Sequence, residues 1–259
     1  MSEYQYCKVD IEDKLMIVTI NRPERLNALH GPANNELGGV FDRFAVDPNL
    51  WVAIITGAGD KAFSAGNDLV YQAEGNPVWR PAAGFAGLTN RYDLHKPVIA
   101  AVNGFAMGGG FEIALACDLI IAAENAIFAL PEPRVGLAAL AGGLVRLPQI
   151  IPMKQAMGMI LTGRRVPASE GQELGFVNEV VPQGEALAGA KRWAEQILEC
   201  SPMSIRASKQ VAYEARDAAS VEEAYNAGYS GIEAMRASAD FIEGPLAFSE
   251  KRAPKWTGG

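Results

Sequence analysis

The chain has 259 residues, of which 49% are hydrophobic and 20% charged, a composition typical of a globular protein and not of a disordered one. A formal net charge of −7 and the lack of a Lys/Arg-rich block disfavour nucleic acid or an anionic membrane as the main partner. The cysteines, Cys7, Cys117 and Cys200, are far apart, which favours reduced thiols in a cytoplasmic protein and indicates no metal site. The N-terminal stretch has no apolar segment typical of a secretory signal.

The first part of the chain predicts buried strands around a helix. The expected elements are a strand over 15–20 with a partner over 4–11, a helix over 32–45 and a strand over 51–56. A polar loop, NRPERLNAL, lies between the first strand pair and the helix, and Arg22 and Arg25 make it basic. Taken alone, two such arginines are usually part of a solvated loop.

The next part is rich in turn residues. The segment 62–69, AFSAGNDL, predicts a turn with free N–H groups, after which Asp68 could open a short helix. By itself this is an ordinary turn. The segment 74–83, EGNPVWRPAA, predicts a surface loop or lid. Residues 88–94 predict a helix that ends before the pre-proline Lys96.

The stretch 96–132 predicts a strand, a glycine-rich turn, a helix, a strand and a short strand. The turn at 108–110 would present backbone N–H groups at a helix start, which attracts negative charge. Glu112 lies just inside that helix, and Glu132 closes the stretch. The glycines alone favour a buried βαβ unit with close packing. A carboxylate on so apolar a helix, however, is seldom buried without a partner or a function. Polar residues and glycines interrupt the stretch too often for a membrane span.

The remainder divides into a last α/β part and a helical tail. Helices are expected over 152–161 and 169–174, a strand over 176–181, and tail helices over 186–199, 205–219 and 221–237. Strands therefore alternate with helices through residues 1–183, as in an α/β domain with parallel pairing. The tail, 184–259, would hide its apolar faces against this core or against a neighbouring subunit.

Several stretches together resemble the crotonase (enoyl-CoA hydratase/isomerase) superfamily, over essentially the whole chain. They are NRPERLNAL, FSAGNDL, KPVIAAVNG and GGGFE, in that order and spacing. Further stretches, GFAGLT, FALPE, TGRR and EGPLAFSEKR, are most similar to the branch that acts on crotonobetainyl-CoA and carnitinyl-CoA. The resemblance implies a ClpP/crotonase-like spiral of ββα repeats, with C-terminal helices that form homotrimers, often paired as hexamers. The substrate would be an acyl-CoA thioester, with coenzyme A as part of the substrate and no separate cofactor.

The resemblance also assigns the chemistry. It implies an oxyanion hole formed by the backbone N–H groups of Asn67 and Gly109, and a catalytic pair, Glu112 and Glu132. Hydrating an α,β-unsaturated thioester places negative charge on the thioester oxygen, and each N–H donor would stabilise it by about 3 kcal/mol. Two carboxylates in one apolar site cannot both ionise cheaply, so an acid would stand beside a base. We interpret Glu132 as the group that handles the α-carbon proton and Glu112 as the group that activates water.

Further residues are implied as contacts to coenzyme A and substrate: Arg25, Ala28, Ala65, Asp68, Leu69, Phe248 and Lys251. The last two would reach the nucleotide, in the same or in a neighbouring subunit. The sequence departs from the family at 137–141, LAALA, where many hydratases carry Pro and then Gly or Asp. This departure weighs against a carnitine-type acyl group, because a quaternary ammonium requires an aromatic face or an acid. Trp79 is a candidate for that aromatic face.

Two other functions are alternatives. A double-bond isomerase would need the oxyanion hole and a base but no attacking water. A non-enzymatic, RNA-binding relative would need neither the oxyanion hole nor a base, and the presence of both glutamates and the acidic net charge argue against it.

Overall fold

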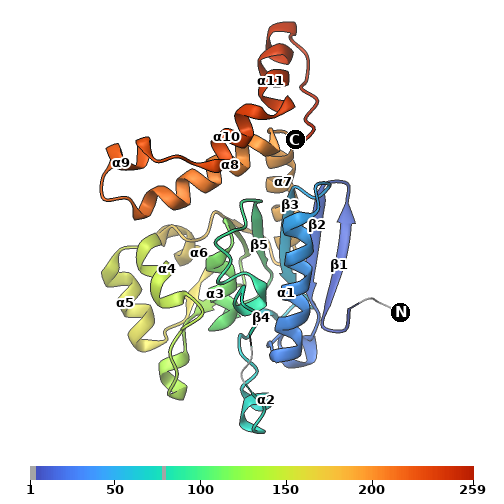
Figure 1. The fold of residues 1–259 in the computed structure, drawn as a ribbon. Helices are drawn as coiled ribbons and strands as arrows, with labels where there is room; N and C mark the ends of the chain where they lie inside the picture. Colours follow the sequence, from blue (N-terminus) through green and yellow to red (C-terminus); the bar gives the residue numbers. More distant parts are fainter. Residues whose placement is uncertain (1–3, 78–79) are drawn as a thin grey trace.

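The structure, a computed structural model, describes residues 4–77 and 80–259 and contains two sheets flanked by helices (Figure 1). The six-stranded sheet has the order β1-β2-β3-β5-β7-β10, and its strands are Cys7–Glu12, Leu15–Ile20, Val52–Gly57, Val98–Val102, Leu119–Ala123 and Glu179–Val181. Only β1 runs antiparallel to its neighbour in this sheet. The four-stranded sheet has the order β4-β6-β8-β9, and its strands are Ala62–Ser64, Phe105–Met107, Ile127–Ala129 and Val166–Pro167.

The chain repeats one pattern, in which a strand of the large sheet is followed by a short strand of the small sheet. This happens at β3–β4, β5–β6 and β7–β8, and β4, β6 and β8 pair in parallel. Helix α2 (Leu69–Ala73) follows β4, and helix α3 (Gly109–Ala116) follows β6. The arrangement confirms the expected spiral of ββα repeats.

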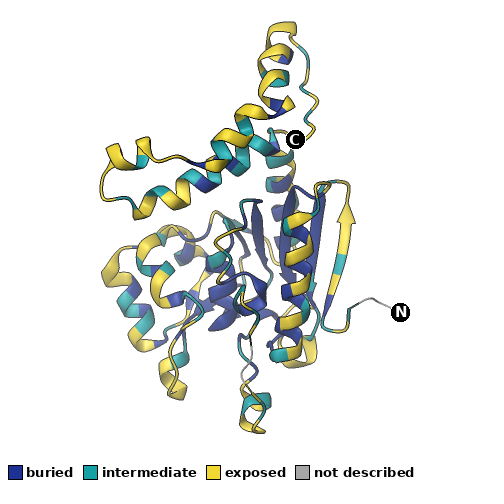
Figure 2. Ribbon diagram, viewed as in Figure 1, coloured by how far each residue is buried: buried dark blue, intermediate teal, exposed yellow. Residues whose placement is uncertain are grey.

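Both faces of the large sheet are buried, and the alternation of side chains along the strands explains why. On one face, Val18 and Ile55 join a cluster with α1 (Gly31–Val46) and α3. On the other face, Ile17 and Ile54 pack against α7 (Ala186–Leu198), whose alanines let it lie close to the strands. The strands are accordingly buried throughout the centre of Figure 2.

The remaining helices divide between the core and a C-terminal arm. Beside the core lie α4 (Gly143–Ile150), α5 (Met153–Thr162) and α6 (Ala168–Leu174). The arm contains α8 (Pro202–Glu214), α9 (Val221–Asn226), α10 (Ser230–Ala237) and α11 (Ala239–Glu250), and it extends away from the sheets. Among the described residues, no helix has the length and apolarity that a membrane crossing requires.

The structure corrects the expected helix at 88–94. This region forms turns after a short 3-10 helix, Phe85–Gly87. Just before it, Gly84, Ala86 and Gly87 have φ of +84°, +53° and +71°, and within it the Asn90 N–H donates to the Ala83 carbonyl over 2.9 Å, a bond that an α-helix does not make. Side chains satisfy the buried backbone instead: the Ala86 N–H donates to Asn34 Oδ1 over 2.8 Å.

Several elements are absent from the predictions. Strand β6 has only three residues between glycines, too few for a periodic signal. Helices α4 and α11 each contain a proline, which disfavours a helix in the sequence pattern. The expected tail helix over 221–237 is two helices, α9 and α10, separated at 227–229.

Candidate active site

The FSAGNDL segment is held by the NRPERLNAL loop through strand-like pairing. The Leu29 N–H donates to the Gly66 carbonyl over 2.7 Å, and the Leu29 carbonyl accepts from the Asp68 N–H over 3.1 Å. Because backbone groups alternate in direction along an extended segment, the intervening Asn67 N–H points away from the loop. It donates to no other described residue.

The glycine turn before α3 lies directly against this segment. Gly66 has φ of +84°, and a Cβ placed on it would lie 2.7 Å from the Gly109 nitrogen and 2.6 Å from the Met107 carbonyl oxygen. Gly109 is the first residue of α3, where no earlier turn of the helix accepts its N–H. This N–H also donates to no other described residue. Two N–H groups that lack acceptors among the described residues therefore lie on adjoining turns, the arrangement that an oxyanion hole requires.

Glu112 lies in α3, one turn after Gly109, and only 3% of it is exposed. Its Oε1 accepts from the Gly143 N–H at the start of α4 over 2.8 Å. The preceding Phe111 packs among Phe128 and Phe176, with ring centroids 5.1 Å away in each case. These contacts fix the helix and hold the Glu112 carboxyl inside the protein.

Glu132 begins a 3-10 helix, Glu132–Val135, that follows β8. Its carboxyl lies over the glycine turn, since a Cβ on Gly108 would come within 2.7 Å of Glu132 Oε1. The other oxygen, Oε2, is buried and has no hydrogen-bond partner among the described residues. An unsatisfied buried carboxyl oxygen is costly, so this atom is available to a ligand or a proton.

Both carboxyls are easier to protonate than ordinary glutamates. Burial raises the pKa of Glu112 to about 7, and the charge of Glu132 acts in the same direction, while the Gly143 N–H opposes the change. Burial also raises the pKa of Glu132. Near neutral pH the site can therefore hold one carboxylic acid beside one carboxylate.

This shift predicts that Glu112→Gln stabilises the protein at alkaline pH. A folded-state pKa near 7 lies above the unfolded value of about 4.3. The contribution of the Glu112 carboxyl to stability is therefore fully present below about pH 4.3 and is lost as the pH rises through 7. The amide of the variant cannot ionise and still accepts the Gly143 N–H. We expect the variant to gain about 3 kcal/mol at pH 8 and almost nothing at pH 4. Thermal unfolding across this range measures it, and an equal gain at both pH values would contradict the shift.

The structure gathers five of the seven expected coenzyme A contacts around the FSAGNDL segment: Arg25, Ala28, Ala65, Asp68 and Leu69. Arg25 ends a 3-10 helix, Pro23–Arg25, and Leu69 opens α2 with 42% exposure. Phe248 lies in α11 and Lys251 just after it, at the end of the molecule opposite α2 (Figure 1). These two are therefore not brought to the site within one chain.

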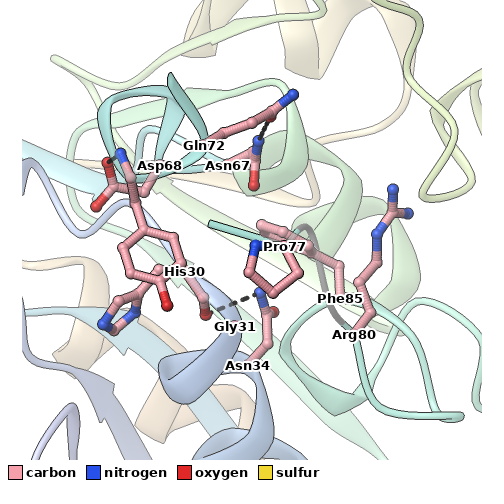
Figure 3. A pocket seen from close by; sticks show the side chains of 10 residues that line it. His30, Gly31, Asn34, Asn67, Asp68, Gln72, Pro77, Arg80 and Phe85 are labelled. Carbon is pink, nitrogen blue, oxygen red and sulfur yellow. Dashed lines mark hydrogen bonds between the residues drawn. The ribbon is translucent and has the colours of Figure 1, made fainter. Parts of the chain in front are cut away.

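A small pocket of about 10 Å³ lies beside the Asn67 turn. Figure 3 shows Asn67 and Asp68 on one wall, Asn34 of α1 and the preceding His30 across from them, and Phe85 at the side. Phe85 closes the space over α3, because a Cβ on Gly109 would lie 2.7 Å from its ring. Phe85 was not identified from sequence, although it belongs to the noted stretch GFAGLT.

A larger cleft of about 930 Å³ opens between the core and α8. Its lining includes Gly84, Ala141 and Gly142, the last of which precedes the Gly143 N–H that binds Glu112. Its size is in the range of pockets that hold small-molecule ligands. The described parts of the expected lid, 74–83, are turns and coil, and Trp79 lies outside the described residues.

The sequence profile of the family described as "Enoyl-CoA hydratase/isomerase" matches residues 10–259. With this fold and this pair of turns, the chain belongs to that family, the crotonase superfamily, whose substrates are acyl-CoA thioesters.

Among curated relatives, the carnitinyl-CoA dehydratase of Escherichia coli strain K12 is 47% identical over 94% of this chain and 95% of that protein. The one from Proteus mirabilis strain HI4320 is 46% identical over 93% of this chain and 94% of that protein.

Solved structures of enoyl-CoA hydratases have the same fold as this chain. An enoyl-CoA hydratase from Mycobacterium tuberculosis H37Rv superposes with a TM-score of 0.91 at 39% identity, covering 98% of this chain and 99% of that one. A carnitinyl-CoA hydratase from Mycobacterium avium gives a TM-score of 0.79 at 41% identity, with 98% of each chain covered.

Proposed function

We propose that the protein is an acyl-CoA hydro-lyase that adds or removes water across the 2,3 double bond of an enoyl-CoA thioester. One observation carries the proposal: two N–H donors without acceptors among the described residues lie beside the buried Glu112 and the half-buried Glu132, both of raised pKa. A hydratase needs both components, since it must stabilise an enolate oxygen and move two protons.

In the proposed reaction the thioester oxygen accepts hydrogen bonds from the Asn67 and Gly109 N–H groups. These donors gain most when the oxygen becomes an enolate, so they lower the barrier and do not merely bind substrate. A glycine is suited to the second position because the Phe85 ring already occupies the space of a Cβ.

The two glutamates divide the proton transfers. In the dehydration direction, ionised Glu132 removes the proton from the α-carbon, and the electrons of that C–H bond move to the thioester oxygen as an enolate. As the carbonyl re-forms, the bond between the β-carbon and its oxygen breaks, and protonated Glu112 gives that oxygen a proton so that it leaves as water. This direction starts from the protonation state in which the charge of Glu132 raises the pKa of Glu112. Hydration is the reverse sequence, which adds one water and starts from ionised Glu112 and protonated Glu132.

We infer that the acyl group is crotonobetainyl or carnitinyl, the finer part of the proposal. The names of the relatives at 47% and 46% identity support it. The segment 137–141 lies where the acyl group would bind, since Ala139 is buried beside Gly143.

A panel of trans-2-enoyl-CoA thioesters tests the proposal through loss of the conjugated thioester absorbance. We expect turnover of crotonobetainyl-CoA to exceed that of crotonyl-CoA, and oxygen from labelled water to enter the product. Faster turnover of crotonyl-CoA would reject the carnitine-type substrate alone. A product without labelled oxygen would reject hydration and favour isomerisation through the same oxyanion hole.

We also propose that the chain forms a homotrimer or a dimer of trimers through the helical region 184–259. The arm exposes large apolar side chains that a monomer would leave in water: Val221, Tyr225, Ile242 and Phe248 are 71% to 87% exposed. In this assembly Phe248 and Lys251 would serve the coenzyme A site of a neighbouring subunit. Light scattering would measure the molar mass of the assembly in solution.

The location in the cytoplasm, which the sequence predicts, stays a prediction.

A further inference from the structure

An ion pair lies beside the Asn67 turn, between Arg22 and Asp68, and Asp68 also lines the small pocket. Arg22 Nη1 is 3.0 Å from Asp68 Oδ2, and the two side chains are 11% and 6% exposed. The same Nη1 also donates to the Ala28 carbonyl. One guanidinium nitrogen therefore connects the NRPERLNAL loop with the residue that follows Asn67.

Asp68 is held at three points. Besides Arg22, its Oδ1 accepts from the Tyr71 N–H over 3.1 Å and so caps α2. Its own N–H donates to the Leu29 carbonyl. The pKa of Asp68 is lowered despite its burial, since the Tyr71 N–H and Arg22 favour the carboxylate. Both carboxylate oxygens are thus bound within the chain.

Arg22 is equally constrained. Its backbone N–H donates to Asn27 Oδ1 over 3.0 Å, and its carbonyl accepts from the Asn27 N–H over 2.9 Å. Asn27 is fully buried and donates to the Ala62 carbonyl in β4 over 2.8 Å. The guanidinium carbon also lies 5.9 Å from the ring centre of Tyr6. Arg22 therefore acts as a rigid link from β4 to Asp68, unlike an ordinary surface arginine.

The side chain of Asn67 has its own partner, since its Nδ2 donates to Gln72 Oε1 over 2.7 Å (Figure 3). With this bond, and with Asp68 fixed on the next position, the peptide that carries the Asn67 N–H has little freedom to rotate. We propose that Arg22 is a positioning residue, whose ion pair with Asp68 sets the direction of the Asn67 N–H donor. The inference rests on the proposed oxyanion role of Asn67.

Arg22→Met should leave the fold but let this peptide rotate. We expect kcat for enoyl-CoA hydration to fall about 10- to 100-fold with little change in KM, because a donor misplaced by about 1 Å loses most of its effect. Asp68→Asn should act in the same direction. Arg22→Lys keeps the positive charge but not the planar guanidinium with its several donors, and should recover part of the lost kcat.

A second readout follows the hydrogen bond itself. A chromophoric cinnamoyl-CoA absorbs at longer wavelength when its thioester oxygen is polarised by donors. We expect a clear red shift with the wild-type protein, a smaller shift with Arg22→Met at equal occupancy, and an intermediate shift with Arg22→Lys.

The control is Glu179→Gln, which weakens an ion pair away from both cavities. Arg192 Nη2 of α7 and Glu179 Oε1 of β10 are 2.8 Å apart, and their side chains are 52% and 34% exposed. The control should lower the melting temperature but leave kcat and the red shift unchanged.

If Arg22→Met lowers only the melting temperature, as the control does, Arg22 is merely structural and the inference is wrong. If the wild-type protein shifts the probe but hydrates no enoyl-CoA, the proposed reaction fails, while a smaller shift in Arg22→Met still supports the inference.

Discussion

Glu132→Gln is expected to lower kcat for enoyl-CoA hydration by about 10³-fold, within the usual range for loss of a general acid or base. Its Oε2 is buried without a partner among the described residues, so no neighbouring group there is placed to take over its proton. An amide has nearly the same shape but neither gives up nor accepts a proton at neutral pH. Glu112→Gln should lose activity to a similar degree.

Both variants should still bind coenzyme A esters, because neither carboxyl belongs to the loop that would hold the nucleotide. The measurements are absorbance loss for turnover and equilibrium titration for binding. Glu173→Gln, at an exposed position of α6, is the control and should behave as wild type. Turnover above about a tenth of the wild-type rate in either variant would contradict the two-carboxylate mechanism.

The two roles separate in an exchange experiment. If Glu132 handles the α-carbon proton, wild-type protein and Glu112→Gln should exchange the α-hydrogens of a saturated acyl-CoA with deuterium oxide, while Glu132→Gln should not. The opposite pattern would reverse the assignment of the two glutamates.

Gly66→Ala is expected to lower kcat by about 10²- to 10³-fold, the cost of losing an oxyanion donor. Gly66 has φ of +84°, where an L-residue is strained, and its Cβ would lie 2.6 Å from Met107 O and 2.7 Å from Gly109 N. The obstacles are backbone atoms, so the two turns must separate. Because each turn carries one donor, their separation would spoil both hydrogen bonds to the enolate.

Gly184→Ala is the matched control for this change. Gly184 has φ of +90°, but a Cβ there meets nothing within 4 Å. It should carry the backbone strain alone, with a modest loss of stability and an unchanged kcat. Circular dichroism would establish that both variants are folded. Equal kcat values for the two variants would show that contact between the turns does not set the donor geometry.

The sequence predicts a residue of this site when the residues that reveal its role lie close to it in the chain. Glu112 was identifiable from the residues alone, because a carboxylate on an apolar helix is conspicuous. The link between Asn67 and Gly109 came only from family resemblance, since their pairing is made by β4 and β6, strands of three residues each. Arg22 read as a solvated loop arginine, because its partner Asp68 lies 46 positions away.

The fold was predicted where hydrophobic runs were long, as in β2, whose expected bounds, 15–20, are those of the structure. It was missed where the backbone follows side-chain hydrogen bonds instead of periodicity. The turns around Phe85 depend on Asn34, which is 52 residues away and gives no signal in the local sequence.

The parallel pairing of β4 with β6 has a geometric consequence for the bound oxygen. Ser64 lies opposite Ala106, so Asn67 and Gly109 each come three residues after that pair, on neighbouring segments of the chain. Gly66 and Gly108, with φ of +84° and +52°, turn both segments out of the ladder just before the two donors. One donor therefore belongs to each of two successive repeats, and an oxygen bound by both would bridge the repeats that the short strands join.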